Sequence, residues 1–370
     1  MALYNWQQKD WPKFTYTIEN VEDILFLFVE KVGMATGILN ALPEKMQLET
    51  MIDIMVSEAI KTSEIEGEYL SRKDVLSSIR KNLGLVSSSE YIQDKKAEGI
   101  GRLMIDVRNT YKDELTKEQL FFWHKMLLPD SRDIAIGQWR THEEPMQIIS
   151  GPLGKQKVHF EAPPSSRVPK EMDRFIKWFN ETAPGGSKEL KKAPIRSAIA
   201  HLYFETIHPF EDGNGRIGRA IAEKALAQGV GRSIMISLSQ TIDANKKAYY
   251  DALKRAQRSN EITGWVKYFV NTIATAQSEA EEQIDFTLKK VKFFDRFKDK
   301  LNERQLKVIR RMLEEGPKGF AGGINASKYG SITKVSKATA TRDLQALKEI
   351  EALIPLGEGG GRSTKYAVNL

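Results

Sequence analysis

Apolar residues recur at helical spacing along most of this chain of 370 residues. Between residues 21 and 42, for example, they fall at Ile24, Phe28, Val32 and Leu39. Such spacing places apolar side chains along one face of an α-helix, which must then pack against other helices. Helices are expected over residues 21–42, 49–61, 71–83, 94–111, 117–127, 170–180, 194–207, 217–228, 246–258 and 264–291. We therefore predict a mainly α fold with a substantial core, since 41% of the residues are hydrophobic.

One segment, MQIISGPLGKQKVHF at residues 146–160, has a different pattern. Two short strand-like runs flank a Gly-Pro-Leu-Gly turn, which predicts an isolated β-hairpin. A two-stranded ribbon is only marginally stable in water. We therefore expect this hairpin to lean on the helical body or to receive a further strand from a partner.

The last part of the chain is expected to form a separate unit. The pattern predicts a helix over 301–316, a short helix over 326–329, a helix over 337–351, and then two strands around a Gly-rich loop. Three helices followed by strand, loop and strand outline a winged helix. Residues 286–370 contain 18 Lys or Arg and 9 Asp or Glu residues, a balance suited to DNA or an acidic protein partner for residues 301–370.

Within this unit, SKATATRDLQALKEI is expected to be a recognition helix, with Thr339, Thr341 and Arg342 on its early turns. The Gly-rich loop that follows resembles a wing, from which Arg362 and Lys365 could contact phosphates. Winged helices also serve as protein-docking modules, and a basic face can simply be solvated. DNA binding and protein docking therefore both stay open.

The chain has no cysteine, which excludes disulfides, thiolate metal sites and cysteine nucleophiles, and fits a reducing compartment. The opening MALYNWQQKDWPKF lacks the apolar run of a signal peptide. No stretch is expected to reach the ~20 apolar residues needed to cross a bilayer. We therefore expect a soluble cytoplasmic protein with no membrane partner.

The string HPFEDGNGRIGR at residues 208–219 lies between two predicted helices and is the most informative about function. Gly213 and Gly215 flank Asn214, and glycines let the backbone take positive φ and turn successive N–H groups toward one point. Arg216 is expected to open the next helix, whose positive dipole end would face the loop. The string therefore predicts an anion site suited to a polyphosphate.

Four side chains in the string suit chemistry on a phosphate. Asp212 can hold a hard divalent cation together with phosphate oxygens and waters. Arg216 and Arg219 are three residues apart, so both guanidinium groups point to one side of a helix and can bind terminal phosphates. His208 is of a residue type whose ordinary pKa, near ~6.5, suits it to accept a hydroxyl proton at neutral pH.

This string resembles the signature HPFx[DE]GNGRxxR of the Fic family, with every specified position present. The similarity covers about residues 115–275 and includes GQWR at 137–140 and the hairpin at 146–160, which resembles the flap that registers a target segment by strand addition. The resemblance implies a Fic-type helical bundle. It divides the chain into an N-terminal helical region (1–112), a catalytic core (113–285), and a linker helix with a winged helix (286–370).

The resemblance implies transfer of AMP from ATP to a Ser, Thr or Tyr hydroxyl of a target protein docked on the flap. His208 would be the general base, and Asp212 would bind the Mg²⁺ or Mn²⁺ that bridges the nucleotide phosphates. The residues that would bind ATP are Gly213, Asn214, Gly215, Arg216, Arg219, Tyr249 and Tyr250. The two tyrosines resemble an aromatic pair near the adenine pocket, although core packing is equally expected for one of them.

A second similarity lies at Thr62, Glu66 and Gly67, which match the family's inhibitory pattern [ST]xxxE[GN] in a helix near residues 49–67. Three carboxylates cluster in TSEIEGE, and negative charge at a helix C-terminus opposes the macrodipole. An ion pair from Glu66 to Arg219 would neutralise part of this cluster and take the arginine away from the γ-phosphate. The resemblance therefore implies an autoinhibited enzyme.

Two other functions stay open at this stage. One is removal of AMP from targets, with Glu66 positioning a water molecule. The other is a DNA-binding regulator whose core senses a nucleotide. The intact His208 and Asp212 favour the transferase, because a sensor can bind ATP without a base. Assembly as a homodimer is also left open.

Overall fold

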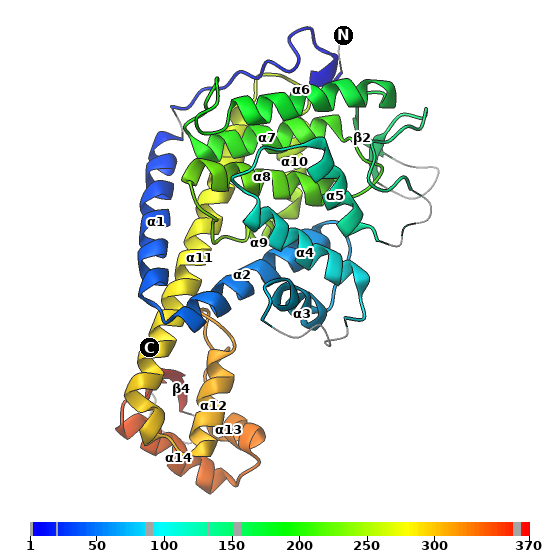
Figure 1. Ribbon diagram of the computed structural model, residues 1–370. Coiled ribbons are helices and arrows are strands. Elements are labelled where there is room, and N and C mark those ends of the chain that lie inside the picture. Colours follow the sequence, from blue (N-terminus) through cyan, green and yellow to red (C-terminus); the bar gives the residue numbers. More distant parts are fainter. Residues whose placement is uncertain are drawn as a thin grey trace. The chain divides into compact units, whose positions relative to one another are not determined.

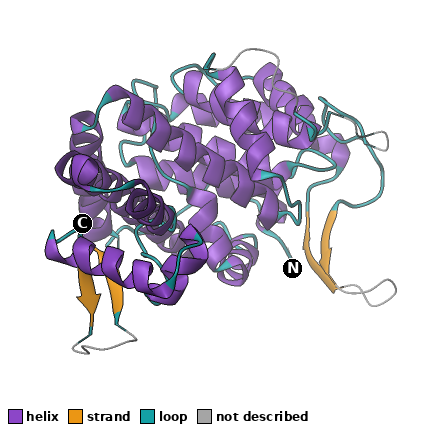
Figure 2. Cartoon of the chain, turned by 90° about the horizontal axis from the view of Figure 1, so that it is seen from below, coloured by secondary structure: helices purple, strands orange, loops and turns teal. Residues whose placement is uncertain are grey.

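The computed structural model describes residues 3–19, 21–85, 92–129, 131, 134–150, 157–357 and 364–370. In this part of the chain most residues are helical, as predicted, and the strands form two separate antiparallel pairs (Figure 2). The tip of the predicted hairpin, residues 151–156, and the predicted wing residue Arg362 lie outside the described residues.

The chain divides into two compact units. Unit 1 comprises Met1–Val32 and Met51–Ser278, and unit 2 comprises Gly33–Thr50 and Glu279–Leu370. Three long helices contribute residues to both: α1 (Glu22–Ala41), α2 (Glu44–Ile65) and α11 (Thr263–Phe297). The domain boundaries expected at residues 112 and 285 stay predictions.

The remaining helices of unit 1 follow the predicted ranges to within a few residues. They are α3 (Arg72–Asn82), α4 (Lys95–Asn109), α5 (Lys117–Leu127), α6 (Val168–Glu181), α7 (Ala193–Ile207), α8 (Asn214–Val230), α9 (Leu238–Ala244) and α10 (Lys246–Ala256). The sequence pattern missed α9, since seven residues are too few to show a helical period. Its start is capped by Ser237, whose side-chain oxygen accepts from the Gln240 N–H.

Helix α7 lies at the centre of unit 1, between α6 and α8 (Figure 1). Every residue from Ala193 to Ile207 is buried, whereas the sequence predicted a single buried apolar stripe. The polar residues of α7 therefore need partners inside the core. Arg196 finds them, because its guanidinium donates to the carbonyls of Phe179 and Ala225, at 2.7 and 3.1 Å, and so joins α6 to α8.

The predicted hairpin is confirmed in its described part. Strands β1 (Gln147–Ser150) and β2 (Lys157–Glu161) pair antiparallel. The Trp6 indole N–H donates to the Glu161 carbonyl at 2.7 Å, and the Arg258 guanidinium donates to the His159 carbonyl at 3.2 Å. The hairpin therefore leans on the helical body and the N-terminal segment, as its marginal stability requires.

Helix α1 corrects one expectation. Its 20 residues have a hydropathy of 1.5 and are long and apolar enough, by length and composition, to cross a membrane. The expectation that no segment reaches this threshold is therefore wrong for α1. Only 11% of its apolar window is buried within the described structure, and Phe26 and Val29 are exposed.

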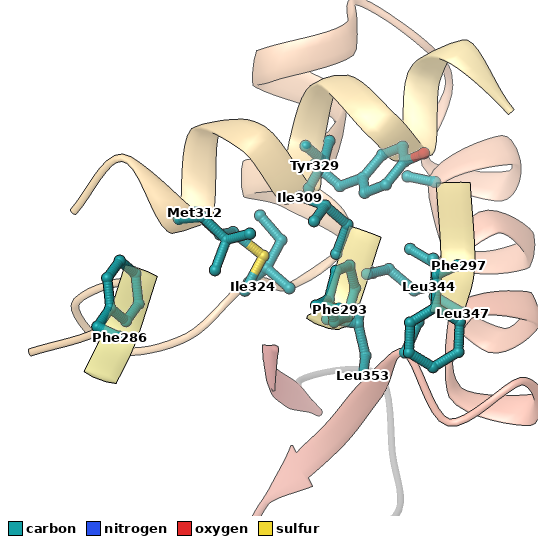
Figure 3. Packing of buried hydrophobic residues seen from close by; sticks show 14 residues of the cluster. Phe286, Phe293, Phe297, Ile309, Met312, Ile324, Tyr329, Leu344, Leu347 and Leu353 are labelled. Atoms are coloured by element: carbon teal, nitrogen blue, oxygen red, sulfur yellow. The ribbon is translucent and has the colours of Figure 1, made fainter. Parts of the chain in front are cut away.

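Unit 2 contains α12 (Glu303–Leu313), α13 (Ala326–Thr333) and α14 (Lys337–Glu349), followed by β3 (Leu353–Leu356) and β4 (Lys365–Val368). Side chains from α11 to β3 meet in one hydrophobic cluster, in which Phe293 and Phe297 lie near Ile309 and Leu347 (Figure 3). The strands pair antiparallel. The observed order of three helices and a strand pair matches the predicted order of elements.

Two glycines provide a matched test of helix packing in unit 1. A Cβ added at Gly99 in α4 would lie 1.8 Å from the Met126 carbonyl oxygen of α5, whereas one at Gly264 in α11 would meet no atom within 4 Å. Gly99→Ala should therefore lower the free energy of unfolding by about 1–3 kcal/mol. Gly264→Ala should leave it unchanged or raise it by at most ~1 kcal/mol. Urea denaturation of the two variants measures both, and equal midpoints would contradict this packing.

Candidate functional site

The string at residues 208–219 forms the loop between α7 and the start of α8, and Arg140 holds this loop in place. The Arg140 guanidinium donates from Nε to the His208 carbonyl at 2.8 Å and from Nη2 to the Ile207 carbonyl at 3.2 Å. Its backbone N–H donates to the Pro209 carbonyl at 2.9 Å. Burial lowers the pKa of Arg140 to about 10, so it stays charged at neutral pH. Sequence reasoning noted GQWR without assigning this role.

An aromatic stack anchors the other side of the loop. Phe210 is fully buried and stacks on the His124 ring, with 4.2 Å between ring centroids. The Gly137 N–H donates to His124 Nδ1 at 2.9 Å, so His124 Nε2 carries the proton and donates to the Asp212 carbonyl at 3.1 Å. Burial lowers the pKa of His124 to about 4, which keeps this ring neutral. The loop is therefore rigidly supported.

The start of α8 forms the predicted concentration of N–H donors. Gly213 has φ +79° and caps the helix, which begins at Asn214, two residues earlier than expected. The first backbone N–H groups of a helix have no partner within it, so they are available to an anion. The Asn214 side chain instead closes the loop, since it donates to the Phe210 carbonyl and accepts from the Phe210 N–H.

His208 lies at the end of α7 with φ +50°, a left-handed conformation that is uncommon for a residue other than glycine. Its side chain is 13% exposed. Burial, followed by the neighbouring positive charge of Arg140, lowers the pKa of His208 to about 4. His208 is therefore neutral at pH 7, with one ring nitrogen free of a proton.

The structure brings Glu66 and Arg219 together, as the sequence predicted. Glu66 Oε1 lies 2.7 Å from Arg219 Nη2. Thr62 adds two bonds, because Arg219 donates from Nε to its hydroxyl at 2.7 Å and from Nη2 to its carbonyl at 2.8 Å. The arginine is 1% exposed. Burial disfavours its charge, but the nearby carboxylates, Glu66 above all, outweigh burial and raise the pKa of Arg219 above its usual value.

A second ion pair, which sequence reasoning missed, lies beside the first. Glu68 binds Arg216 through Oε2 and Nη1, and its other oxygen lies 2.7 Å from Lys96 Nζ. Gly67, with φ +83°, makes the turn that presents both carboxylates to α8. Both arginines that were predicted to hold phosphates are thus paired with carboxylates. The acidic cluster in TSEIEGE was the signal for this second pair.

Gly215 has no side chain, and this leaves room for the Glu66 carboxylate. A Cβ added at Gly215 would lie 2.1 Å from Glu66 Oε1. The carboxylate therefore rests against the first turn of α8, where negative charge is favoured by the helix dipole. This is also where the N–H groups that the sequence predicts to bind phosphate are found.

Asp212 is the candidate metal ligand and is the most open of the string's charged residues, with 56% of its side chain exposed. Its Oδ1 accepts from the Gly213 N–H at 2.5 Å and lies 3.6 Å from Arg216 Nη2. Among the described residues there is no group of three or more His, Cys, Asp or Glu that could enclose a metal. One exposed carboxylate suits a Mg²⁺ ion that is held mainly by phosphates and waters.

The two tyrosines differ in their surroundings. Tyr249 is buried, and its hydroxyl lies 2.8 Å from His201 Nε2. Tyr250 is 39% exposed, and its ring centroid lies 5.1 Å from that of Tyr249. Tyr249 therefore packs in the core, as was expected for one of the pair, and Tyr250 is the one with an accessible face.

Two family models match the chain. A domain of unknown function, DUF4172, matches residues 4–85, and the Fic/DOC family matches residues 114–226. A probable protein adenylyltransferase of Aquifex aeolicus is 27% identical over 146 residues, which make up 40% of this chain and 38% of that protein. The chain therefore matches well under half the length of this relative.

Solved structures share the fold over more of the chain. A Fic family protein from Desulfovibrio desulfuricans aligns with 97% of this chain and 98% of its own, at 19% identity and a TM-score of 0.55. Fic-1 from C. elegans aligns over 73% of this chain and 74% of its own, at 18% identity and a TM-score of 0.52. These likenesses show a Fic-type helical fold. The stretch that matches the Fic/DOC family model, residues 114–226, contains most of unit 1's α5 to α8 and the complete string at 208–219.

Proposed function

We propose that the protein transfers AMP from ATP to a hydroxyl side chain of a target protein. One observation carries the proposal: a buried, neutral histidine lies beside a helix start whose two arginines are opposite in charge to a triphosphate. His208 supplies the base, and Arg216 and Arg219 supply the cations. The likeness to a probable protein adenylyltransferase supports the same chemistry.

The reaction follows from these positions. His208 accepts the proton of a Ser, Thr or Tyr hydroxyl, and the oxygen attacks the α-phosphorus in line. The bond to the β-phosphate breaks, pyrophosphate leaves, and the proton on His208 passes to solvent. Arg216, Arg219 and the N–H groups of Gly215 and its neighbours stabilise the negative charge on the phosphates. The first turn of α8 and the loop at Gly213 thus cradle the nucleotide.

A divalent cation completes the proposed substrate. Asp212 would hold Mg²⁺ or Mn²⁺ through one carboxylate oxygen, in keeping with its exposure. When bound, the ion neutralises phosphate charge and orients the leaving pyrophosphate. The accessible ring of Tyr250 is the better candidate for the adenine than Tyr249, whose hydroxyl is bonded to His201.

We propose further that the enzyme is autoinhibited. Glu66 binds Arg219, and Glu68 binds Arg216, so both phosphate-binding cations are occupied. ATP must displace these carboxylates to align its α-phosphorus, and a misplacement of even ~1 Å can cost about a hundredfold in rate. Thr62 bonds would keep Arg219 in place after Glu66 leaves.

Partners are proposed from the exposed elements. The hairpin of β1 and β2 would dock an extended segment of the target by strand addition. In unit 2, Thr341 and Arg342 lie on the exposed face of α14, which supports a winged helix whose recognition helix contacts DNA or a protein. Cytoplasmic location and assembly as a homodimer are retained as proposals, the first because the chain has no cysteine.

The chemistry can be tested with labelled ATP and a cytosolic extract in the presence of Mg²⁺. Label at the α-phosphate should appear on protein, because the AMP group is transferred. His208→Ala should abolish the signal and keep ATP binding within about threefold, since the phosphate site is intact. Transfer of a γ-phosphate label would indicate a kinase, and release of AMP from labelled protein would favour the reverse reaction.

The inhibitory role of Glu66 can be tested by self-modification. Glu66→Gly should raise the rate of AMP incorporation by about tenfold to a hundredfold, because Arg219 becomes free for the γ-phosphate. Glu64→Gln is the matched control, since Glu64 lies in the same acidic cluster but pairs with Lys61. Equal rates for the wild type and Glu66→Gly would reject the inhibitory reading.

The depressed pKa of His208 predicts an unusual tolerance of acid. The base is neutral above a pKa of about 4, so transfer by Glu66→Gly should be similar at pH 5.5 and pH 7.5. A histidine with the ordinary pKa would be about one-tenth neutral at pH 5.5, and the rate would fall about tenfold. Circular dichroism at both pH values controls for unfolding. A reversible tenfold fall would show that His208 is not held neutral.

A further inference from the structure

Glu205 is a buried carboxyl group that the proposed reaction does not use. It lies on α7 one turn before His208, and its Oε2 is 3.7 Å from His208 Nδ1, with 5% of the Glu205 side chain exposed. His208 Nδ1 and Glu205 Oε1 are both buried and make no hydrogen bond of standard geometry with the described residues. Buried polar atoms without a partner are rare, so each calls for an explanation.

The space for Glu205 is provided by α8. A Cβ added at Gly218 would lie 2.3 Å from Glu205 Oε1, so only glycine at this position lets the carboxyl group sit between α7 and α8. Gly218 belongs to the string at 208–219, but the family signature as matched leaves its position unspecified. The close approach to Glu205 is therefore a structural reason for glycine at position 218.

The groups around Glu205 favour its neutral form. Burial, followed by the Glu66 carboxylate, raises its pKa to about 8 against the opposing charge of Arg219. A neutral carboxyl group still has a carbonyl oxygen that accepts a hydrogen bond. The backbone carbonyl of Glu205 is the other acceptor near the His208 ring. Of the two, the side-chain oxygen Oε2 lies 3.7 Å from the ring nitrogen Nδ1.

A neutral histidine can act as a base through one ring nitrogen only when the other nitrogen carries the proton. The hydrogen bond made by the second nitrogen decides which tautomer is present. In structures without substrate such bonds are often long and shorten when the reacting complex forms. The 3.7 Å separation of Glu205 Oε2 and His208 Nδ1 fits this pattern.

We propose that the Glu205 side chain is a positioning residue that keeps the His208 proton on Nδ1, so that Nε2 is the free acceptor for the target hydroxyl. The inference rests on the proposed function for the role of Nε2, but the tautomer itself is a property of the chain alone. His124 offers a parallel, since one partner there also fixes the state of a ring nitrogen. The Gly137 N–H donates to His124 Nδ1 and so leaves that nitrogen without a proton.

The test is ¹⁵N NMR of the full chain labelled at its five histidines, with His208 identified by the loss of its signals in His208→Ala. Glu205→Gln keeps a carbonyl oxygen at the same place, and Glu205→Leu removes it at similar size. At pH 7.5 the wild type and Glu205→Gln should show an unprotonated Nε2 on His208. Glu205→Leu should show a mixture of tautomers or a protonated Nε2.

Kinetics give the second readout. In the Glu66→Gly background, Glu205→Leu should lower single-turnover AMP transfer by about a hundredfold, while Glu205→Gln should stay within about threefold. ATP affinity should change by less than about threefold in both variants. An unchanged affinity shows that the protein is still folded, so that a lower rate reflects the misplaced His208 ring. An unchanged His208 tautomer in folded Glu205→Leu would overturn the proposal and assign the role to the backbone carbonyl. If the tautomers are as expected but no variant transfers AMP, the proposed function is refuted and the role of Glu205 in setting the tautomer still holds.

Discussion

Two buried arginines at the start of α8 set the main physical constraint on this protein. Arg219 is 1% exposed and Arg216 is 3% exposed, so neither charge is solvated by water to any large extent. Leaving a buried charge without its partner costs about 3–5 kcal/mol. Some anion must therefore cover these arginines at all times. Glu66 and Glu68 supply it in the present structure, and nucleotide phosphates would supply it during the proposed reaction.

This constraint accounts for the direct contacts between α2, which precedes the acidic turn, and α8, which contains most of the motif. The turn at Gly67 places two carboxylates against one helix start, and Thr62 fixes the orientation of Arg219 by two further bonds. In the proposed function, inhibition and substrate binding are therefore alternatives at a single place. The same charges reach α7, since Glu66 raises the pKa of Glu205. His208, Glu205 and Glu66 thus form one electrostatic group.

Much of this arrangement could be predicted from the sequence, because it depends on local patterns. The long helices are recognised by the period of their apolar residues, and the hairpin by its turn residues. The string at 208–219 contains the residue types that phosphate chemistry needs. The Glu66–Arg219 pair was predicted from the resemblance of Thr62, Glu66 and Gly67 to the family's inhibitory pattern, and the acidic helix end agreed with it. The expectation that no segment is long and apolar enough to cross a bilayer failed for α1, whose mean hydropathy is 1.5.

Other features depend on contacts between distant segments, which spacing along the chain does not report. Arg140 and Glu205 are ordinary polar residues in sequence, and only the packing of α7 shows that both act on the end of that helix. The all-round burial of α7 also escaped prediction, because its polar residues are satisfied by neighbours that the period of one helix cannot identify. Tyr249 and Tyr250 are adjacent in sequence, yet tertiary packing buries one and exposes the other.

The central claim is that Glu66 and the terminal phosphates of ATP compete for Arg219. Calorimetry of ATP and AMP binding tests it most directly, with His208→Ala as the parent so that no transfer occurs. Adding Glu66→Gly should tighten ATP binding by about tenfold or more, the worth of a hydrogen bond to a charged group, and leave AMP binding unchanged. An equal effect on both nucleotides, or no effect on either, would contradict the account, because AMP has no phosphate that can reach the site from which Glu66 was removed.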